Sequence, residues 1–512
     1  MSKTVTPIVV GVGQFANPVD VPDYTPMSPV EIAAAAARGA IADAEGGTAL
    51  APHVDAIVTT RTFEDTGPPR DASFGKSNNF PRSIARRAGV DPDLAIWAHA
   101  GGNTPQTLLS EMFDRIGSGD LSMALLAGGE AVSTIRALEQ SGEKVDWSEV
   151  LDEPVEDRGS GLEGLMEEAL LAHGVVTAPS IYGLIENARR ANRKRSRTDY
   201  AREMAELFAP FSEVAARNPF SSTRRSYTPD ELAERSDGNR LISDPYTRLL
   251  VARDQVNLGA AVLLTSVERA RELGIPETKW VYLHGRADLR EHALLERADL
   301  GTSPAAELAV NTALSAAGIG VSDLSHIDLY SCFPISVFAV SDAMGLDAGD
   351  PRRLTTTGGL PYFGGPGSNY SMHGIASIVE CVRDEEGSYG FVGANGGVLS
   401  KYSVGVYSTR PTSWNPSETK ALQAQLDAVP GPPAVQNTEG DAQVETYTLE
   451  YDRNGTPSTG VVIGRLSQGG ERFVARTENR DVSTLQAMHD IDPLGRSIRV
   501  RPVEGGNRFV FG

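Results

Sequence analysis

Apolar runs of strand length alternate with helix signals from the start of this chain, and this alternation limits the possible folds more than any other feature. The run PIVVGVGQ predicts a strand. The next segment, residues 28–44, predicts a helix with Ser28 as N-cap and Pro29 as its first residue. Further strands are predicted in the runs VDAIVTT, LAIWAHA and LSMALLAGGEA. Apolar runs without polar alternation are typical of strands covered on both faces, so the pattern predicts a layered α/β fold.

The second half of the chain repeats the first in outline. A helix at residues 304–319, a strand at residues 326–333 and a helix at residues 335–346 are predicted in the same order as their counterparts in the first half. Two strands, YGFVGANGG and YSVGVYSTR, close this half. Two similar halves indicate a duplicated βαβ-rich unit.

The segment between the two halves has a different character. Residues 146–240 are charged, helical in pattern and poor in β-branched runs, which indicates an insertion packed over the strand ends of the first domain. A chain of 512 residues is long enough for about three domains. We expect an N-terminal α/β domain at residues 1–145 plus 241–275, an inserted helical domain at 146–240 and a second α/β domain at 276–410.

The last hundred residues are predicted to form a linker and a separate β domain. Residues 411–440 are rich in Pro, Ser, Asn and Gly, with one short helical piece, and are interpreted as the linker. Short alternating strands at residues 441–512, with a hairpin signal at Asn454–Gly455, predict a small five-stranded barrel of the OB type. We expect this barrel to cover the larger domain rather than to bind nucleic acid, because its aromatic residues are sparse and its charge is mixed.

The overall charge narrows the range of partners. The chain has 47 basic and 67 acidic residues, a formal charge of −20, which argues against general binding of nucleic acid or of an anionic membrane. No run of 18 apolar residues occurs, and the N-terminus is typical of a buried first strand rather than a signal peptide. The two cysteines, Cys332 and Cys381, do not form a disulfide framework and fit a reducing cytoplasm.

A glycine-rich stretch, Leu354–Gly374, precedes a helix-like run in the second half. Its glycines and prolines exclude regular helix or strand. A chain carries so much irregular backbone where it must approach a ligand or a neighbouring segment closely, and the alternative is a tight turn between domains.

Three pieces of the sequence resemble the motifs of thiolases. LLAGGEAVS resembles the thiolase stretch AGGxExMS, DLYSCF resembles the NEAF or HDCF loop, and GGLPYFGGPG resembles GGxxxxGHPxG. Together with NRLISDPYTRLL and NLGAAVLLTS, they resemble the sterol-carrier-type, thiolase-like branch over residues 5–410. The resemblance implies an α/β thiolase fold, with two duplicated βαβαβ halves in αβαβα layers. An inserted helical loop domain and a small additional OB-like β-barrel would complete it.

The same resemblance implies that the reactive groups of a thiolase are missing. A thiolase uses a nucleophilic Cys, an activating His and a second Cys as acid and base. These positions fall on Gly102, on Gly365, and on Gly393 or Ala394, and the Asn or His of the NEAF or HDCF loop falls on Tyr330. We therefore do not expect ordinary condensation or thiolysis.

Four other side chains are candidate catalytic residues. Tyr330 and Tyr370 resemble tyrosines of the thiolase-like aldolases of steroid side-chain breakdown, where a hydroxyl can relay a proton without an acyl-enzyme. Cys332 lies by analogy near the oxyanion site, with a small buried packing residue as the alternative. His373 begins the helix after the glycine-rich stretch, with a structural hydrogen-bonding role as the alternative.

The resemblance implies coenzyme A (CoA) or an acyl-CoA as the ligand, without a covalently bound cofactor. We expect it between the inserted domain and the strand ends, near Gly102, Asn103, Gly365 and Asn395. The basic run RRANRKRSR, which contains Arg193 and Arg195, is a candidate for its phosphates, and the alternative is a solvated helix face.

Other functions and assemblies remain open at this level. One is an acyl-CoA lyase or aldolase that uses Tyr330 and Tyr370, and another is a non-catalytic assembly subunit with the barrel as its docking surface. Thiolases pair through an edge strand whose counterpart here is LAIWAHA. If the chain covers that edge it is a monomer, and if the edge stays free it is a homodimer.

Overall fold

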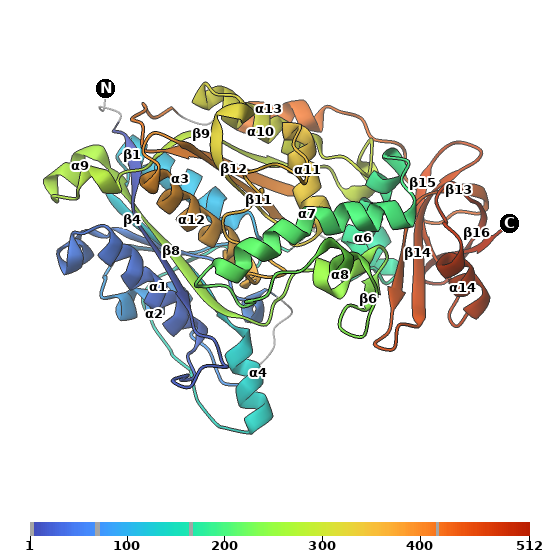
Figure 1. Ribbon diagram of the computed structural model, residues 1–512, viewed down its shortest axis with the longest axis horizontal. Helices are drawn as coiled ribbons and strands as arrows, with labels where there is room; N and C mark the ends of the chain where they lie inside the picture. Colours follow the sequence, from blue (N-terminus) through green and yellow to red (C-terminus); the bar gives the residue numbers. More distant parts are fainter. Residues whose placement is uncertain (1–4, 67–71, 163–166, 416–418) are drawn as a thin grey trace.

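Two β-sheets lie face to face with two helices between them, and a barrel stands at one end of the molecule (Figure 1). The computed structural model describes residues 5–66, 72–162, 167–415 and 419–512. The first sheet, in the order β1-β8-β4-β2-β3-β5, consists of β1 (Pro7–Ala16), β2 (Ala56–Thr59), β3 (Leu94–Trp97), β4 (Met123–Ala131), β5 (Glu156–Asp157) and β8 (Asn257–Ser266). The second, in the order β10-β11-β12-β9, consists of β9 (Tyr282–Arg290), β10 (Leu324–Leu329), β11 (Tyr389–Gly396) and β12 (Lys401–Ser408).

The two sheets share one topology. The order β1-β8-β4-β2 in the first corresponds to β9-β12-β11-β10 in the second, with two antiparallel pairings followed by one parallel pairing in each. Beside β10, the amide of Leu329 donates to the carbonyl of Leu354 at 3.0 Å, so the start of the glycine-rich stretch lies where β3 lies in the first half. The predicted duplication is confirmed.

The helices complete five layers, α-β-α-β-α. The central pair, α3 (Thr104–Ser118) and α12 (Tyr370–Asp384), shares an apolar core with both sheets. The outer helices are α1 (Pro29–Asp43) and α2 (Phe80–Ala88) on the first sheet, and α10 (Pro304–Ala317) and α11 (Pro334–Met344) on the second. Two shorter helices follow strands β4 and β8: α4 (Val132–Ser141) and α9 (Val267–Glu272).

The start of α1 shows how local sequence positions these layers. The hydroxyl of Ser28 accepts from the amide of Glu31 at 3.2 Å, and the Glu31 carboxylate accepts from the amide of Ser28 at 2.8 Å. Both bonds satisfy amide groups that the first turn leaves free. The predicted N-cap at Ser28 and the first helical residue Pro29 are confirmed.

The inserted region is mostly helical, as predicted. Its helices are α5 (Glu168–Ala172), α6 (Ala178–Asn192), α7 (Arg197–Arg217) and α8 (Pro229–Ala233). Two of the expected boundaries shift. Residues 156–157 extend the first sheet as β5. Residues 241–247, assigned to the first domain from sequence, join the sheet of the barrel, where β6 (Leu241–Ser243) pairs with β13 and β7 (Tyr246–Thr247) pairs with β6.

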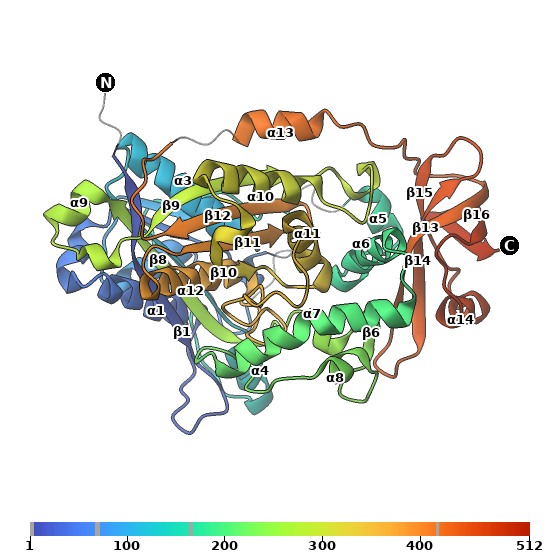
Figure 2. The same ribbon diagram turned by 45° about the horizontal axis from the view of Figure 1, so that its top comes forward.

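The C-terminal domain is a closed five-stranded barrel, which confirms the prediction. It is preceded by α13 (Thr419–Asp427), which lies against β9 and α10 (Figure 2). The barrel has the order β13-β14-β15-β17-β16 and closes because β13 pairs with both β14 and β16. A helix between the third and fourth strands completes an OB-like arrangement. Its elements are β13 (Gly440–Tyr451), β14 (Pro457–Leu466), β15 (Arg472–Arg476), α14 (Val482–Asp490), β16 (Ser497–Val503) and β17 (Gly506–Phe511).

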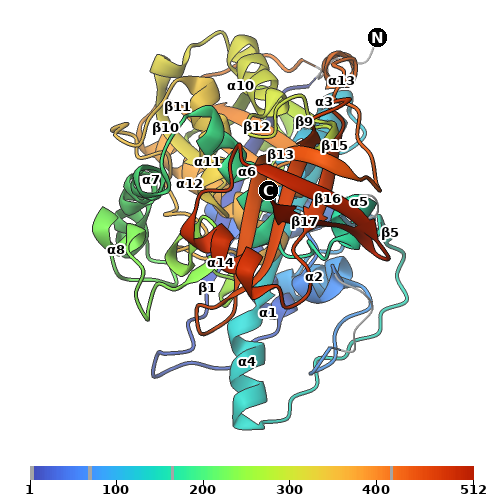
Figure 3. The same cartoon turned by 90° about the vertical axis from the view of Figure 1, so that its right-hand side faces the viewer.

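The barrel is packed against the inserted helices along one side. Figure 3 views the molecule from the end where the barrel lies, with the barrel in front. Side chains of β14 and β15 alternate between two environments, because successive residues of a strand point to opposite faces. Val462 and Phe473 lie in the barrel's own core, whereas Val461, Ile463 and Val474 belong to the core that contains α5, α6 and α7. In OB folds the second and third strands form the face that binds oligonucleotides. Here that face is buried against the rest of the chain.

Two buried arginines hold the barrel in place. Arg190 of α6 makes a bidentate ion pair with Asp492 of the barrel at 2.6 and 2.8 Å. Arg472 of β15 donates to Glu445 within the barrel and to the carbonyls of Leu295 and Arg297 outside it.

No helix in the described part of the chain combines the length and apolarity needed to cross a membrane.

Candidate functional site

Two loops and the end of a strand meet beside the central helices. Gly102 lies just before α3, Tyr330 just after β10, and Asn395 near the end of β11. A Cβ built on Gly102 would overlap the Cζ and hydroxyl oxygen of Tyr330 and would lie 2.5 Å from the carbonyl oxygen of Asn395. The hydroxyl of Ser371, on α12, donates to the carbonyl of Gly102 at 2.5 Å. The structure therefore brings together the predicted residues Gly102, Asn395 and Tyr330.

Asn103 completes this junction. A Cβ on Gly396 would overlap the Oδ1 of Asn103, so the end of β11 and the start of α3 are in direct contact. The amide group of Asn103 donates to the hydroxyl of Thr107 at 3.1 Å, while its buried Oδ1 has no hydrogen-bond partner in the described structure. Gly396 is thus required by packing between the two halves.

Tyr330 stacks edge-on against Tyr370, with ring centroids 5.4 Å apart. The hydroxyl of Tyr370 shares a 2.6 Å hydrogen bond with Thr357, whose hydroxyl donates to the carboxylate of Asp328 at 2.9 Å. Burial raises the pKa of both tyrosines, so both hydroxyls stay protonated near neutral pH. The two predicted tyrosines are brought together, but through their rings rather than through a hydrogen bond.

Cys332 lies in a second buried cluster behind the junction. Its sulfur is 3.2 Å from the hydroxyl of Ser336, and the Asn395 amide donates to Ser336 at 3.4 Å and to the Tyr182 hydroxyl at 3.0 Å. Burial raises the pKa of the Cys332 thiol to about 11, so little thiolate is present at neutral pH. The arrangement agrees with a packing residue more than with a nucleophile.

His373 is fully buried inside the layer of α12. Its Nδ1 lies 2.8 Å from the Oε1 of Gln14, and its Nε2 has no partner in the described structure. Burial lowers the pKa of His373 to about 3, so the ring remains neutral. The ring of Phe363, on the glycine-rich stretch, lies against it with ring centroids 5.0 Å apart. These contacts are those of a structural histidine.

The glycine-rich stretch is almost entirely buried, and the inserted helices cover it. A Cβ on Gly358 would lie 2.5 Å from backbone and side-chain atoms of Ala215 on α7, and one on Gly359 would lie 2.6 Å from the ring of Phe211. The segment after α7 adds hydrogen bonds from Asn218 to the carbonyl of Thr357 and from the amide of Ser222 to the carbonyl of Phe363. The glycines thus allow helix α7 to approach the loop closely.

Gly365 is held against the chain just before β8. Its amide donates to the carbonyl of Arg253 at 2.7 Å, and a Cβ on Gly365 would lie 3.2 Å from the side chain of Leu360. A large side chain at this position would displace Leu360 or the backbone of Arg253.

Arg253, the residue that accepts this hydrogen bond from Gly365, also lines a pocket of about 610 Å³. The pocket lies between the inserted region, residues 223–239, and residues 248–255, with Pro361 and Tyr362 of the glycine-rich stretch as a further wall. Its cations and carboxylates are Arg225, Arg248, Arg253, Glu231, Glu234 and Asp254. Arg225 pairs with Glu231, and Arg253 donates to the Thr223 hydroxyl at 3.2 Å, whereas Arg248 has no carboxylate partner among the described residues.

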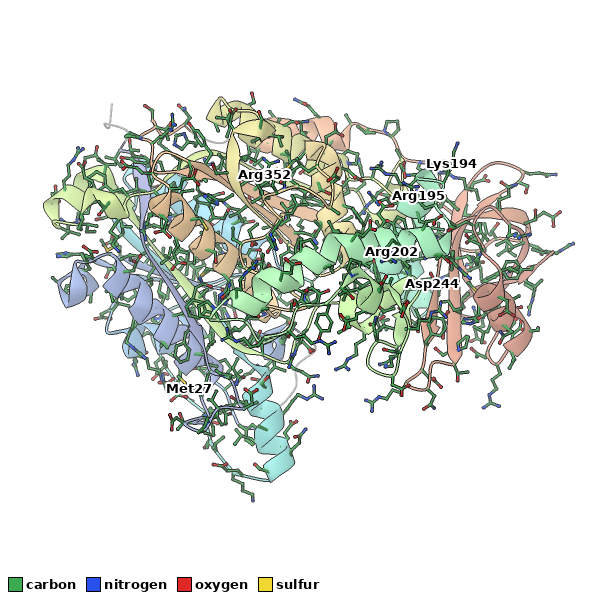
Figure 4. All side chains as sticks on the ribbon, in the orientation of Figure 1. Met27, Lys194, Arg195, Arg202, Asp244 and Arg352 are labelled. Carbon is green, nitrogen blue, oxygen red and sulfur yellow. The ribbon has the colours of Figure 1, made fainter. Side chains whose placement is uncertain are left out.

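Arg193 and Arg195 do not line this pocket and lie on the loop between α6 and α7. Figure 4 labels Arg195, which lies beside the barrel. Arg193 donates to Asp342 at 2.7 Å, and Arg195 lies 3.7 Å from Glu203. Arg189 and Arg190 of the same basic run are buried in ion pairs. The structure therefore does not bring Arg193 and Arg195 together with Gly102 or Gly365.

Glu186, a buried carboxylate beside the Cys332 cluster, is a further candidate that no sequence motif marks. It accepts hydrogen bonds from the hydroxyls of Tyr200 at 2.5 Å and Tyr246 at 2.9 Å, and from the amide of Ile335 at 2.7 Å. Burial raises the pKa of Glu186 to about 7. Neither Glu186 nor the arginines around the pocket stand in a motif, so only their position in the fold distinguishes them.

These features define a thiolase fold with an inserted helical region and an added barrel, and comparisons with known proteins agree. The family model for the additional C-terminal domain of thiolase-like proteins of type 1 matches residues 421–505. The solved structure of a monomeric SCP2-thiolase-like protein type 1 from Mycobacterium smegmatis is 44% identical, with 99% of each chain covered and a TM-score of 0.84. The chain therefore belongs to the type 1 thiolase-like proteins of the thiolase superfamily.

More distant relatives share parts of this architecture. The acetyl-CoA acetyltransferase 1 of Arabidopsis thaliana is 30% identical over 141 residues, which is 27% of this chain and 31% of the plant protein. An Ltp2-ChsH2(DUF35) aldolase is 19% identical, with 78% of this chain and 97% of that chain covered and a TM-score of 0.56. The acetyl-CoA acetyltransferase of Syntrophomonas wolfei is 16% identical, with 80% and 100% covered and a TM-score of 0.53. At 19% and 16% identity, the last two proteins show only that their fold is shared by this chain.

Proposed function

We propose that this protein binds CoA or an acyl-CoA without carrying out the thiolase reaction. The lack of the thiolase reaction is inferred from the position of Tyr330. Its ring and hydroxyl occupy the space that a side chain at residue 102 would need. Thiolase chemistry needs a thiol at that place to accept the acyl group. The other candidate groups do not replace it, because the Cys332 thiol is buried and protonated and His373 is buried and neutral.

The pocket beside Gly365 supports the first part of the proposal. It lies between the inserted region and the chain before β8, and it includes Arg253, whose carbonyl accepts from the amide of Gly365, one of the residues near which the ligand is expected. Gly102 and Asn395, the other expected neighbours, do not line it. Arg225, Arg248 and Arg253 are suited to the phosphates of CoA, because guanidinium groups bind phosphate in a bidentate manner. Tyr227 and Tyr362 provide aromatic surface in the same pocket.

Two measurements test this function. Incubated with acetoacetyl-CoA and free CoA, the protein is expected to show only the background rate of thiolysis, and a rate near that of a true thiolase would contradict the proposal. In isothermal titration with CoA, Arg248→Gln is expected to weaken binding by about tenfold, the effect of losing one charge-assisted hydrogen bond. Arg499→Gln, an exposed arginine of the barrel, is the matched control and should leave binding unchanged. Absence of CoA binding by the unmodified protein would favour a non-catalytic assembly subunit.

A second candidate function is cleavage of a β-hydroxyacyl-CoA, because the Tyr330 hydroxyl lies beside Gly102 and the Asn395 carbonyl. A protonated hydroxyl can donate a hydrogen bond or a proton to a substrate oxygen. If this function holds, Tyr330→Phe abolishes cleavage while CoA binding remains. A protein that cleaves no β-hydroxyacyl-CoA, or a Tyr330→Phe variant with full activity, would exclude this role.

We also propose that the protein is a monomer. In thiolases an edge strand of the first domain pairs with a second subunit, but here β5 pairs in parallel with β3. The amide of Arg158 donates to the carbonyl of Trp97 at 3.0 Å, and that of Ala100 donates to the carbonyl of Ser160 at 2.9 Å. A covered edge offers no free hydrogen-bonding groups to a second chain. Light scattering after size exclusion is expected to give the mass of one chain, 54.5 kDa. Twice that mass at micromolar concentration would contradict the inference.

A further inference from the structure

A second cationic region shares no lining residue with the pocket beside Gly365. Two adjoining pockets, of about 400 and 380 Å³, are both lined by His99, Arg290 and Lys401. The larger one also contacts the first turns of α3 at Thr104 and Thr107. We call these adjoining pockets the β9–β12 pocket, because Arg290 is the last residue of β9 and Lys401 is the first of β12.

Arg290 and Lys401 are directly opposite each other on neighbouring antiparallel strands. Side chains in that position lie within about 5.5 Å at Cβ, and like charges there destabilise a sheet. Neither side chain has a carboxylate partner among the described residues. Burial and the charge of Arg290 lower the pKa of Lys401, as expected for two cations held close together. An anion bound between the two side chains would relieve their mutual repulsion.

Arg297 adds a third cation, and it is almost completely buried. Its relative exposure is 3%, and its side chain donates to two backbone carbonyls, those of His292 at 3.1 Å and Val398 at 3.3 Å. The Nη1 of Arg297 has no hydrogen-bond partner in the described structure, although the residue lines the pocket. A buried guanidinium without an anion is costly, because its desolvation is not compensated.

The carboxylates around the pocket are already engaged with other donors. Glu291 accepts from the Ser303 hydroxyl at 2.7 Å and the Ala305 amide at 3.2 Å, at the start of α10. Glu167 accepts from the amides of Leu294 and Leu295, and Asp288 accepts from the Ser403 hydroxyl. Arg158, the third arginine at the pocket, is neutralised by a bidentate pair with Glu111. Among the described residues, the pocket's lysines and arginines without a carboxylate partner are Arg290, Arg297, Lys401 and Lys420, of which Lys420 is exposed.

We propose that the β9–β12 pocket binds a small phosphorylated molecule, with Arg290, Lys401 and Arg297 as its anion ligands. A dianionic phosphate matches the converging positive charge, and guanidinium groups bind phosphate through paired N–H donors. The hydroxyl-bearing first turns of α3 line the same pocket, and the positive end of a helix also favours an anion. This site is independent of the proposed CoA pocket, since the two share no lining residue.

The test is isothermal titration of the full chain with pyrophosphate, followed by the variants Lys401→Gln and Arg290→Gln. The unmodified protein is expected to bind saturably, and each variant to bind at least tenfold more weakly. Neither variant should lower the thermal midpoint of the free protein, because each removes a repulsive charge. Lys144→Gln, an exposed lysine elsewhere, is the matched control and should bind normally.

Arg248→Gln separates this site from the CoA pocket and should leave the pyrophosphate affinity unchanged. The proposal is overturned if the unmodified protein does not bind pyrophosphate, if Lys401→Gln and Arg290→Gln bind normally, or if only Arg248→Gln loses binding. If malonate, a dicarboxylate, binds more tightly than pyrophosphate, the proposal that the ligand is a phosphorylated molecule is overturned. Failure of CoA to bind would leave the pyrophosphate result unaffected, so the two proposals fail separately.

Discussion

Replacing Arg472 with methionine is expected to lower the free energy of unfolding by about 3–5 kcal/mol. The Arg472 side chain is fully buried and joins the barrel to the second α/β half through the carbonyls of Leu295 and Arg297. Its loss leaves these carbonyls and the carboxylate of Glu445 without their main donor, and unpaired buried acceptors cost more than the bond itself contributes. Urea unfolding followed by circular dichroism measures the loss. Hydrogen exchange at residues 293–297 should show whether the barrel has separated from the core.

Arg465→Met is the matched control for this experiment. Arg465 also pairs with Glu445, at 3.1 Å, but its side chain is 37% exposed and makes no contact with Leu295 or Arg297 among those the structure gives. Exposed ion pairs contribute about 0–1 kcal/mol, so the control should unfold almost as the unmodified protein does. Equal losses for the two variants would show that the barrel is not held by the bonds that Arg472 makes outside it.

Replacing Gly358 with alanine is expected to cost about 2–5 kcal/mol, from backbone strain and crowding together. Gly358 has a φ of +113°, a conformation that residues with a side chain rarely adopt. A Cβ there would also lie 2.5 Å from the backbone of Ala215 on α7. The same urea titration measures the effect, and we expect α7 to lose protection from hydrogen exchange first.

Gly345→Ala isolates the strain from the crowding. Gly345 ends α11 with a φ of +68°, and nothing lies within 4 Å of its Cβ position. Its replacement should therefore cost only about 1–2 kcal/mol. If Gly358→Ala costs no more than Gly345→Ala, then close packing of α7 is not what requires glycine at position 358.

The glycine-rich stretch was identified from sequence as a place where backbone approaches a ligand or a neighbouring segment. In the structure Gly358 and Gly359 lie against α7, and Gly365 lies against Arg253. These neighbours belong to the inserted region and to the chain before β8. The need for close approach could be read from the run of glycines, whereas the identity of the neighbour depended on how distant segments pack.

Much of the architecture follows from local pattern. The apolar runs, the cap at Ser28 and the turn at Asn454–Gly455 predicted the elements, because periodicity and turn chemistry act over a few residues. The duplication and the barrel followed from the order of these elements. The covering of β3 by β5 was not predictable, since Glu156 and Asp157 have no strand pattern and join the sheet only as its last member.

The candidate site, like the fold, was predictable from sequence only in part. The sequence by itself determined that residues 102 and 365 carry no side chain, and that Tyr330, Cys332, Tyr370 and His373 were the remaining candidates. Only the tertiary structure decided that Tyr330 occupies the space at Gly102, that burial makes His373 neutral, and that Arg297 is buried without an anionic partner. The physical reason is that burial and contact arise between segments far apart in the chain. The chemistry of a side chain depends on those neighbours as much as on its own type.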